Sequence, residues 1–113
     1  LESVISLQLG HYEKAYYSTF SAAKLYKKSS EIYLMRGLAL LGLKRYSESI
    51  PVFNSCLQID SMDMEAYNGR AFAHFNMQNY NEALADFRRS IEINSYFYEG
   101  LYNIANTYFQ MKK

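Results

Sequence analysis

Apolar residues recur along this chain with the spacing of helices. Over residues 31–43, 64–77 and 98–111 they return every three or four positions, whereas a half-buried strand would alternate at every second residue. Polar connections lie between the apolar stretches, as at residues 27–30 and 60–63. The pattern predicts an all-α chain of about seven helices, with no strand. Their expected ranges are residues 1–8, 13–26, 31–43, 48–59, 64–77, 81–93 and 98–111. The expected helix caps are Ser29 or Ser30, Ser47, Asp63 and Asn81.

The chain also repeats itself without a gap. Residues 30–63 fall on residues 64–97, so that Tyr33 matches Tyr67 and Phe53 matches Phe87. A period of this length marks an array of helix–turn–helix units, which bury their apolar faces only by stacking on one another. We therefore expect one domain over residues 1–113. Its parts are a partial unit at 1–29, full units at 30–63 and 64–97, and a partial unit at 98–113.

The residues at fixed places in each unit resemble the tetratricopeptide repeat, whose pattern is Trp-x2-Leu-Gly-x2-Tyr, then Ala-x3-Phe, then Pro. The matching residues of the two full units are Tyr33, Arg36, Gly37, Leu40, Ser49, Phe53 and Ser61, then Tyr67, Arg70, Ala71, His74, Ala83, Phe87 and Ser95. Serine stands for the family's proline at each unit's end. The resemblance implies a right-handed α-solenoid of antiparallel helix pairs. It also implies a non-enzymatic scaffold that binds other proteins.

Many members of this family bind an extended peptide in a concave groove lined by the first helix of each unit. The residues expected to line such a groove here are Leu34, Leu38, Leu41, Asn68, Phe72, Phe75, Asn76, Tyr102, Asn106 and Phe109. An apolar floor with asparagine side chains suits a peptide or helix segment. The alternative that the sequence leaves open is that neighbouring units of a longer protein cover part of this floor.

One known ligand class of the family is disfavoured by the residues themselves. The chaperone-binding members hold a C-terminal carboxylate with two lysines, an arginine and two asparagines. The matching positions in this sequence are Leu34, Leu38, Gly69, Glu99 and Asn103. None of these side chains is cationic, so we expect the partner to be a protein or peptide other than a chaperone tail.

The C-terminal part of the chain offers two further candidate surfaces. Tyr96, Phe97 and Tyr98 form either a wet extension of the core or an exposed aromatic patch for a partner. In the last helix, we expect one side to face the preceding pair, and this side carries Leu101, Ile104, Ala105 and Tyr108. No helix follows to cover the other side, which carries Tyr102, Phe109 and Met111. An uncovered apolar face predicts self-association through this helix, or cover by a further repeat.

Composition and charge narrow the classes of partner and the cell compartment that fit this chain. Twelve basic and eleven acidic residues give a net charge of +1, too balanced for the strongly basic face of a nucleic-acid-binding protein. No apolar run approaches the roughly eighteen residues of a membrane helix, so we expect no membrane contact. The single cysteine, Cys56, excludes an internal disulfide and favours a reducing, cytoplasmic compartment. Because the chain begins at Leu1 without a signal-like segment, we expect a piece of a longer protein.

Catalytic and metal chemistry find little support. His11 and His74 lie far apart in the repeat, and neither has a cysteine or acidic residue at ligand spacing. Cys56 matches Ala22 and Ser90, small residues at a helix crossing, which indicates an inert core position. The sequence holds no glycine-rich phosphate loop. We therefore expect no cofactor, no metal site and no enzymatic activity.

Overall fold

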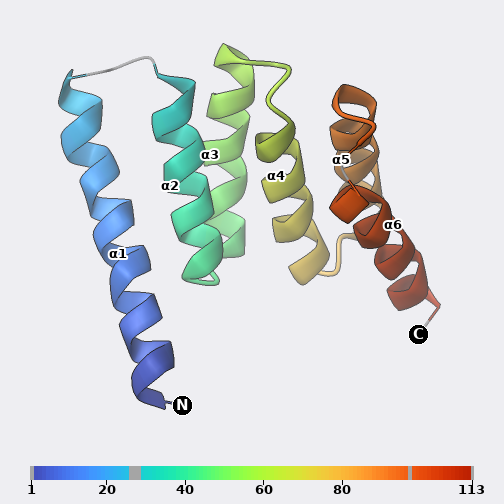
Figure 1. Ribbon diagram of the computed structural model, residues 1–113, viewed down its shortest axis with the longest axis horizontal. Helices are drawn as coiled ribbons and strands as arrows, with labels where there is room; N and C mark the ends of the chain where they lie inside the picture. The colour runs from blue at the N-terminus through green and yellow to red at the C-terminus, as the bar shows by residue number, and fades with distance from the viewer. Residues whose placement is uncertain (1, 26–28, 97, 113) are drawn as a thin grey trace.

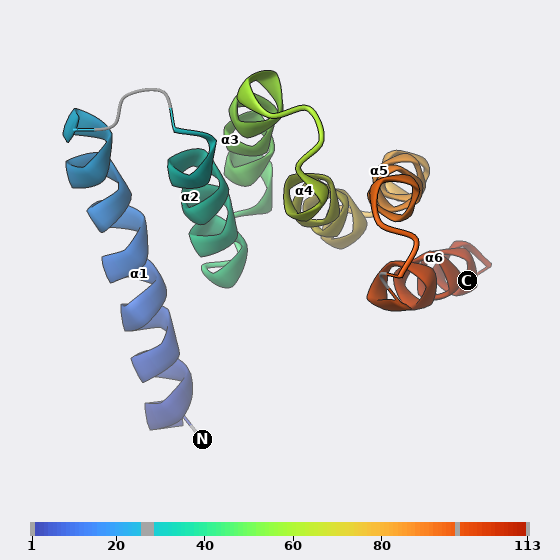
Figure 2. The same ribbon diagram turned by 45° about the horizontal axis from the view of Figure 1, so that its top comes forward.

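The computed structural model describes residues 2–25, 29–96 and 98–112, and its regular structure over these ranges is helical throughout. The helices are α1 (Glu2–Leu25), α2 (Ser30–Gly42), α3 (Tyr46–Ile59), α4 (Met64–Asn76), α5 (Tyr80–Ile93) and α6 (Tyr98–Met111), as Figure 1 shows. α2 pairs with α3 and α4 with α5, while α1 packs on α2 and α6 on α5. Figure 2 shows the six helices following one another in chain order. This arrangement confirms the all-helical solenoid.

The turn inside the first full unit recurs in the second. Lys44 and Gln78, which share one repeat position, take the left-handed conformation, with φ of 61° and 65°. The following amides, of Arg45 and Asn79, donate back to the carbonyls of Leu40 and His74 at 2.9 and 2.8 Å. These bonds close the helix end in the manner of a Schellman motif.

The first helix differs from the prediction, which placed a turn at residues 10–12. α1 runs unbroken from Glu2 to Leu25, and the described part of the chain therefore has six helices. Gly10 is the repeat equivalent of Lys44 and Gln78, yet its φ is not positive. A left-handed turn breaks helical hydrogen bonds. The break is stable only if the helix before the turn gains enough packing to offset their loss. Without a left-handed residue at Gly10, α1 continues through this position as one helix.

Two phenylalanines at equivalent positions form the centres of the core. Phe53 on α3 lies with Cys56 and Ala66, and Phe87 on α5 lies with Ala71 and Ala83. The Phe53 ring passes between two glycines. A Cβ atom at Gly37 or at Gly69 would lie 2.6 or 2.5 Å from it. The small residues therefore let α2 and α4 approach α3 closely, as the repeat pattern predicts.

The helix starts were predicted with mixed success. Asp63 caps α4, because its Oδ1 accepts a hydrogen bond from the Ala66 amide at 3.1 Å. Ser29 occupies the cap position of α2 without a side-chain hydrogen bond. The expected caps Ser47 and Asn81 are wrong, since both lie inside helices that begin at Tyr46 and Tyr80. The caps are Arg45 and Asn79 instead, two residues earlier than expected, so these helices start sooner.

The orientation of α6 also departs from the prediction. The residues that it buries against the preceding pair are Gly100 and Thr107, with Ile104 half-buried beside the Phe87 cluster. Leu101, Ala105 and Tyr108 are exposed instead. In α4 the equivalent positions face the second helix of the same unit, and α6 has no such helix after it among the described residues.

Candidate functional site

The residues expected to line a groove fall on α2, α4 and α6, which share one side of the molecule (Figure 1). We call this side the α2/α4/α6 face. α2 and α4 pack beside each other, whereas α6 packs on α5 and touches α4 at most slightly. Leu34 and Leu41 are half-buried and pack against the Phe53 cluster, and Phe75 packs against the Phe87 cluster. These three contribute to the core as well as to the face.

Leu38 and Phe72 are two apolar side chains that α2 and α4 leave partly open to solvent on this face. They occupy the same position of successive repeats and are 37% and 40% exposed. The Phe72 ring meets the Phe87 ring edge to face, with centroids 5.9 Å apart. On α6, Tyr102 and Phe109 are 70% and 60% exposed. The face thus offers an apolar strip with aromatic side chains beyond it.

The three asparagines of the face differ in their hydrogen bonding. Asn76 donates from Nδ2 to the Phe72 carbonyl at 2.8 Å. Asn106 is half-buried. The Oδ1 atom of Asn68 is buried and accepts no hydrogen bond from the residues that the structure describes. An unsatisfied buried amide oxygen is unusual in a folded protein, because losing water without gaining a donor costs about 1–3 kcal/mol.

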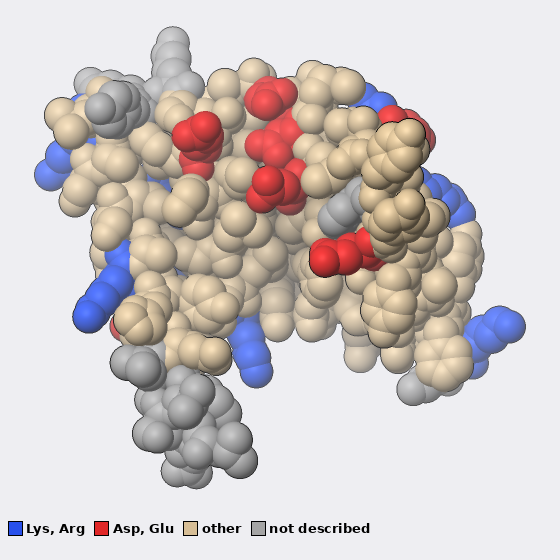
Figure 3. Space-filling view, in the orientation of Figure 1, with Lys and Arg blue, Asp and Glu red and all other residues tan. Residues whose placement is uncertain are grey.

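Acidic side chains mark one end of the face. Every helix from α2 to α6 carries a glutamate in its first turn, at residues 31, 48, 65, 82 and 99. A carboxylate there is stabilised by the helix dipole. Alternate helices run in opposite directions, so Glu31, Glu65 and Glu99 share one end of the face. Figure 3 shows acidic side chains gathered over its upper part, with the basic ones at its edges.

The two arginines of α2 and α4 are engaged with other helices and do not offset this charge. Arg70 binds both Asp86 oxygens, at 2.8 and 2.7 Å, and also donates to Asn54 Oδ1 at 2.7 Å. Arg70 therefore ties α4 to α3 and α5, and its bond to Asp86 raises the pKa of the guanidinium. Arg36 donates to Thr19 Oγ1 at 2.9 Å and lies 3.9 Å from the centre of the Phe20 ring.

The role of these arginines was not predicted. Both stand where the family pattern has leucine, and their recurrence at one repeat position was the available signal. A charged residue held at a leucine position in two units indicates a partner between the helices. That partner is Asp86 for Arg70, and Thr19 for Arg36.

The expected aromatic patch is represented by two exposed tyrosines. Tyr96 and Tyr98 are 80% and 74% exposed, at the connection between α5 and α6. Phe97 lies outside the described residues. Whether these side chains bind a partner stays a prediction.

The candidate reactive side chains are held in unreactive settings. Cys56 is fully buried and lies 3.4 Å from Asp63 Oδ2. Burial, together with the Asp63 carboxylate, raises the pKa of this thiol to about 12, so the nucleophilic thiolate is scarce at neutral pH. The ring of His74 is half-buried, and its Nδ1 lies 3.5 Å from Asn79 Nδ2. Within the described ranges, no three His, Cys, Asp or Glu side chains are grouped to hold a metal ion.

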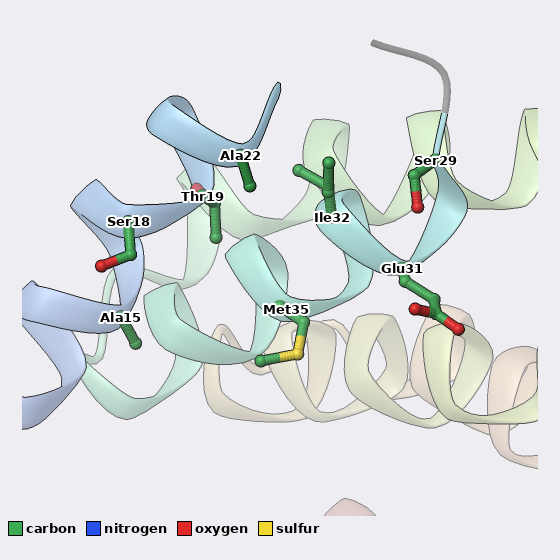
Figure 4. A pocket seen from close by; sticks show the side chains of 8 residues that line it. All are labelled: Ala15, Ser18, Thr19, Ala22, Ser29, Glu31, Ile32 and Met35. Atoms are coloured by element: carbon green, nitrogen blue, oxygen red, sulfur yellow. The ribbon is translucent and has the colours of Figure 1, made fainter. Parts of the chain in front are cut away.

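A cavity of about 470 Å³ lies between α1 and α2 (Figure 4). We call it the α1/α2 cavity, and its lining is mostly apolar or small. The lining residues are Ala15, Ser18, Thr19 and Ala22 of α1, Ser29 just before α2, and Glu31, Ile32 and Met35 of α2. Sequence reasoning missed it, because residues 1–8 were expected to form a separate helix that pairs with residues 13–26. No helix of the described chain is long and apolar enough to cross a membrane.

Comparisons with known proteins agree on the architecture. Two family models described as tetratricopeptide repeat match residues 30–61 and 65–97. No curated protein matches the chain.

Three solved structures show the same fold at low sequence identity. The first TPR of Spaghetti (RPAP3), bound to the HSP90 peptide SRMEEVD, has a TM-score of 0.86 and 19% identity over 92% of this chain and 82% of that one. The Arabidopsis OM64 TPR domain gives 0.83 and 22% over 93% and 92%. MamA from Desulfovibrio magneticus RS-1 gives 0.84 and 16% over 92% of this chain and 59% of its own. These likenesses concern the fold alone.

Proposed function

The chain belongs to the tetratricopeptide-repeat family, and on that premise we propose that it is a protein-interaction module that binds a peptide segment on the α2/α4/α6 face. The observation that carries this proposal is the pair Leu38 and Phe72. Both are large apolar residues at the same repeat position, and both are more than one-third exposed. Apolar side chains at the same position of successive repeats can both contact a segment that lies across the helices.

The charges of the face favour a segment without acidic groups. Glu31, Glu65 and Glu99 make no ion pair within the described chain, and Arg36 and Arg70 are turned to other helices. The peptide held by the RPAP3 domain, SRMEEVD, ends in acidic residues. The positions here that match the family's carboxylate clamp include Leu38 and Glu99. We therefore propose a neutral or basic apolar segment, and not an acidic C-terminal tail.

The proposal is tested by selecting dodecapeptides from a random displayed library on the purified chain. Affinities of the enriched peptides are then measured by fluorescence anisotropy. Leu38→Glu should weaken their binding more than about tenfold, because a carboxylate replaces an apolar contact. Ala85→Glu is the matched control, since Ala85 is exposed on α5, away from the face. Binding that survives Leu38→Glu, or a library that yields no binder, would refute the site.

We also assign no catalytic role to the chain, a prediction that rests on the side chains available. The only thiol is buried with a raised pKa. The displayed-peptide selection described above would identify the sequence of the segment that the chain binds.

A further inference from the structure

The first helices of the two full repeats present their side chains to the α2/α4/α6 face in the same order. Glu31 and Glu65 lie in the first turns of α2 and α4, and Leu38 and Phe72 lie seven residues further on. Seven residues return to the same side of a helix, about 10 Å along its axis. α2 and α4 run in the same direction and pack beside each other (Figure 1). Equal positions therefore form two rows across both helices, an acidic row and an apolar row.

The acidic row holds more carboxylates than the two glutamates. Asp60 and Asp63 lie in the connection that leads into α4, and Glu99 lies in the first turn of α6. None of these five carboxylates takes part in an ion pair within the described ranges. Figure 3 shows acidic side chains gathered across the upper part of this side of the molecule. The whole chain carries a net charge of +1, so the negative field is local to this row and attracts cations to it.

Asn68 lies on α4 between the two rows, three residues after Glu65 and four before Phe72. Residues at these spacings are neighbours on the surface of a helix. The Oδ1 atom of Asn68 is buried and accepts no hydrogen bond from the described residues. The equivalent residue of α2 is Leu34, which packs against the Phe53 cluster. The chain thus keeps an acceptor without a donor at a position where an apolar side chain fits.

The distance between the two helices selects the backbone conformation of a segment that crosses them. The axes of packed helices stand about 8–10 Å apart. In a polyproline II helix, residues three apart point the same way and are separated by about 9 Å. In a strand, the residues that point the same way are only about 6.7 Å apart. A polyproline II segment therefore presents equivalent side chains to α2 and α4 in step.

We propose, on the basis of the function proposed above, that the segment bound by this face is basic and adopts the polyproline II conformation. It crosses α2 and α4 at the level of Asn68 and donates a backbone N–H to Oδ1. Asn68 is half-buried and the torsion that orients its amide is soft, so Oδ1 can turn toward the segment. Apolar side chains three residues apart contact Leu38 and Phe72. Lysine or arginine side chains, also three apart, reach Glu31 and Glu65.

A peptide of three Leu-Lys-Pro triplets, blocked at both ends and fluorescently labelled, is the probe. Its prolines favour the polyproline II conformation. Fluorescence anisotropy with the whole chain compares it with Leu-Gln-Pro and Leu-Glu-Pro peptides of the same length. The lysine peptide should bind most tightly, and the glutamate peptide at least about tenfold more weakly. Raising the salt concentration from about 50 mM to about 500 mM should weaken binding of the lysine peptide, because salt screens exposed charges.

Substitutions in the acidic row test the charge contacts. Glu31→Gln and Glu65→Gln should each weaken binding of the lysine peptide about two- to fivefold, and should leave binding of the glutamine peptide unchanged. Glu82→Gln is the matched control. Glu82 is exposed in the first turn of α5, away from the face, so this variant loses the same charge from the same place in a helix.

A substitution between the rows tests the hydrogen bond. Asn68→Leu should weaken binding of both the lysine and the glutamine peptide about two- to tenfold. The same variant should raise the urea midpoint of the free chain, because leucine occupies this position in α2. A residue with a structural role alone would not lower affinity while raising stability. Full affinity of Asn68→Leu would overturn the placement of the segment.

The outcomes separate this proposal from the proposed function. A glutamate peptide that binds as tightly as the lysine peptide, or a Glu31→Gln/Glu65→Gln double variant with unchanged affinity, would overturn the basic ligand class. Peptides selected from the library that lose binding with Leu38→Glu, yet carry no excess of lysine or arginine, would also overturn it and would leave peptide binding by the face intact. A library that yields no binder would refute the face itself, and this proposal with it.

Discussion

Replacing Gly69 with alanine should destabilise the chain, because the ring of Phe53 fills the space beside Gly69. A Cβ atom there would lie 2.5 Å from Phe53 Cζ and 2.8 Å from Cε1, whereas carbon atoms in contact ordinarily stand about 3.5–4.0 Å apart. The ring has no room to move away. Gly37 also borders the ring, since an added Cβ there would lie 2.6 Å from Cε1, and Phe53 has no exposed surface.

Two opposing effects set the size of the loss at Gly69. Alanine is more favourable than glycine inside a helix by about 1 kcal/mol. Forcing a methyl group into closed packing costs about 1–3 kcal/mol, and the confined ring places this case at the upper end. The net loss is about 2 kcal/mol, which lowers the Tm of a domain of roughly 100 residues by about 10 °C.

Urea unfolding followed by helical circular dichroism measures the effect. Gly10→Ala is the matched control, because a Cβ at Gly10 meets nothing within 4 Å and the residue lies inside α1. It should stabilise the chain by about 1 kcal/mol. The same substitution, glycine to alanine, should therefore change the free energy of unfolding in opposite directions at the two sites. Adding Phe53→Leu to Gly69→Ala should recover part of the loss. A Gly69→Ala variant as stable as the unsubstituted chain would show that the packing yields, contrary to this reasoning.

Two further predictions concern buried polar groups. Asp86→Ala leaves the Arg70 guanidinium, whose side chain is 24% exposed, without its carboxylate, and should cost about 2 kcal/mol in urea unfolding; an unchanged unfolding midpoint would contradict it. The raised pKa of Cys56, about 12 against an ordinary 9.0, means that above pH 9 the unfolded thiol ionises while the folded one keeps its proton. Stability should therefore fall by up to about 1.4 kcal/mol per pH unit from this residue, and Cys56→Ala should show a shallower loss over the same pH range.

The repeat period was enough to place most helices but not to decide where a helix breaks. It located α2 to α6 to within a few residues, because periodic apolar positions report which side of a helix is buried. It also aligned Gly10 with Lys44 and Gln78, which break their helices. A break is favoured only when the preceding helix packs back on the next one. Whether the preceding helix packs back depends on more than the residues around Gly10, so the local sequence does not show that the helix continues there.

The site residues were predicted with the same limits. Leu38 and Phe72 fall on one face, as their common repeat position requires, but Leu34, Leu41 and Phe75 turned out to be shared with the core. The pattern gives the direction of each side chain and not the distance between helices. α6 lies away from α4, and this spacing depends on the contacts of α5 with α6. The α1/α2 cavity was not predicted, because residues 1–8 were expected to form a separate helix that pairs with residues 13–26.

Residues at the same repeat position are buried or exposed according to whether the second helix of their own unit lies against them. Ala71 is fully buried and Ala105 is exposed, although the two share one place in the pattern. In an array, each unit contacts only its neighbours, so the middle of the chain cannot compensate for an open end.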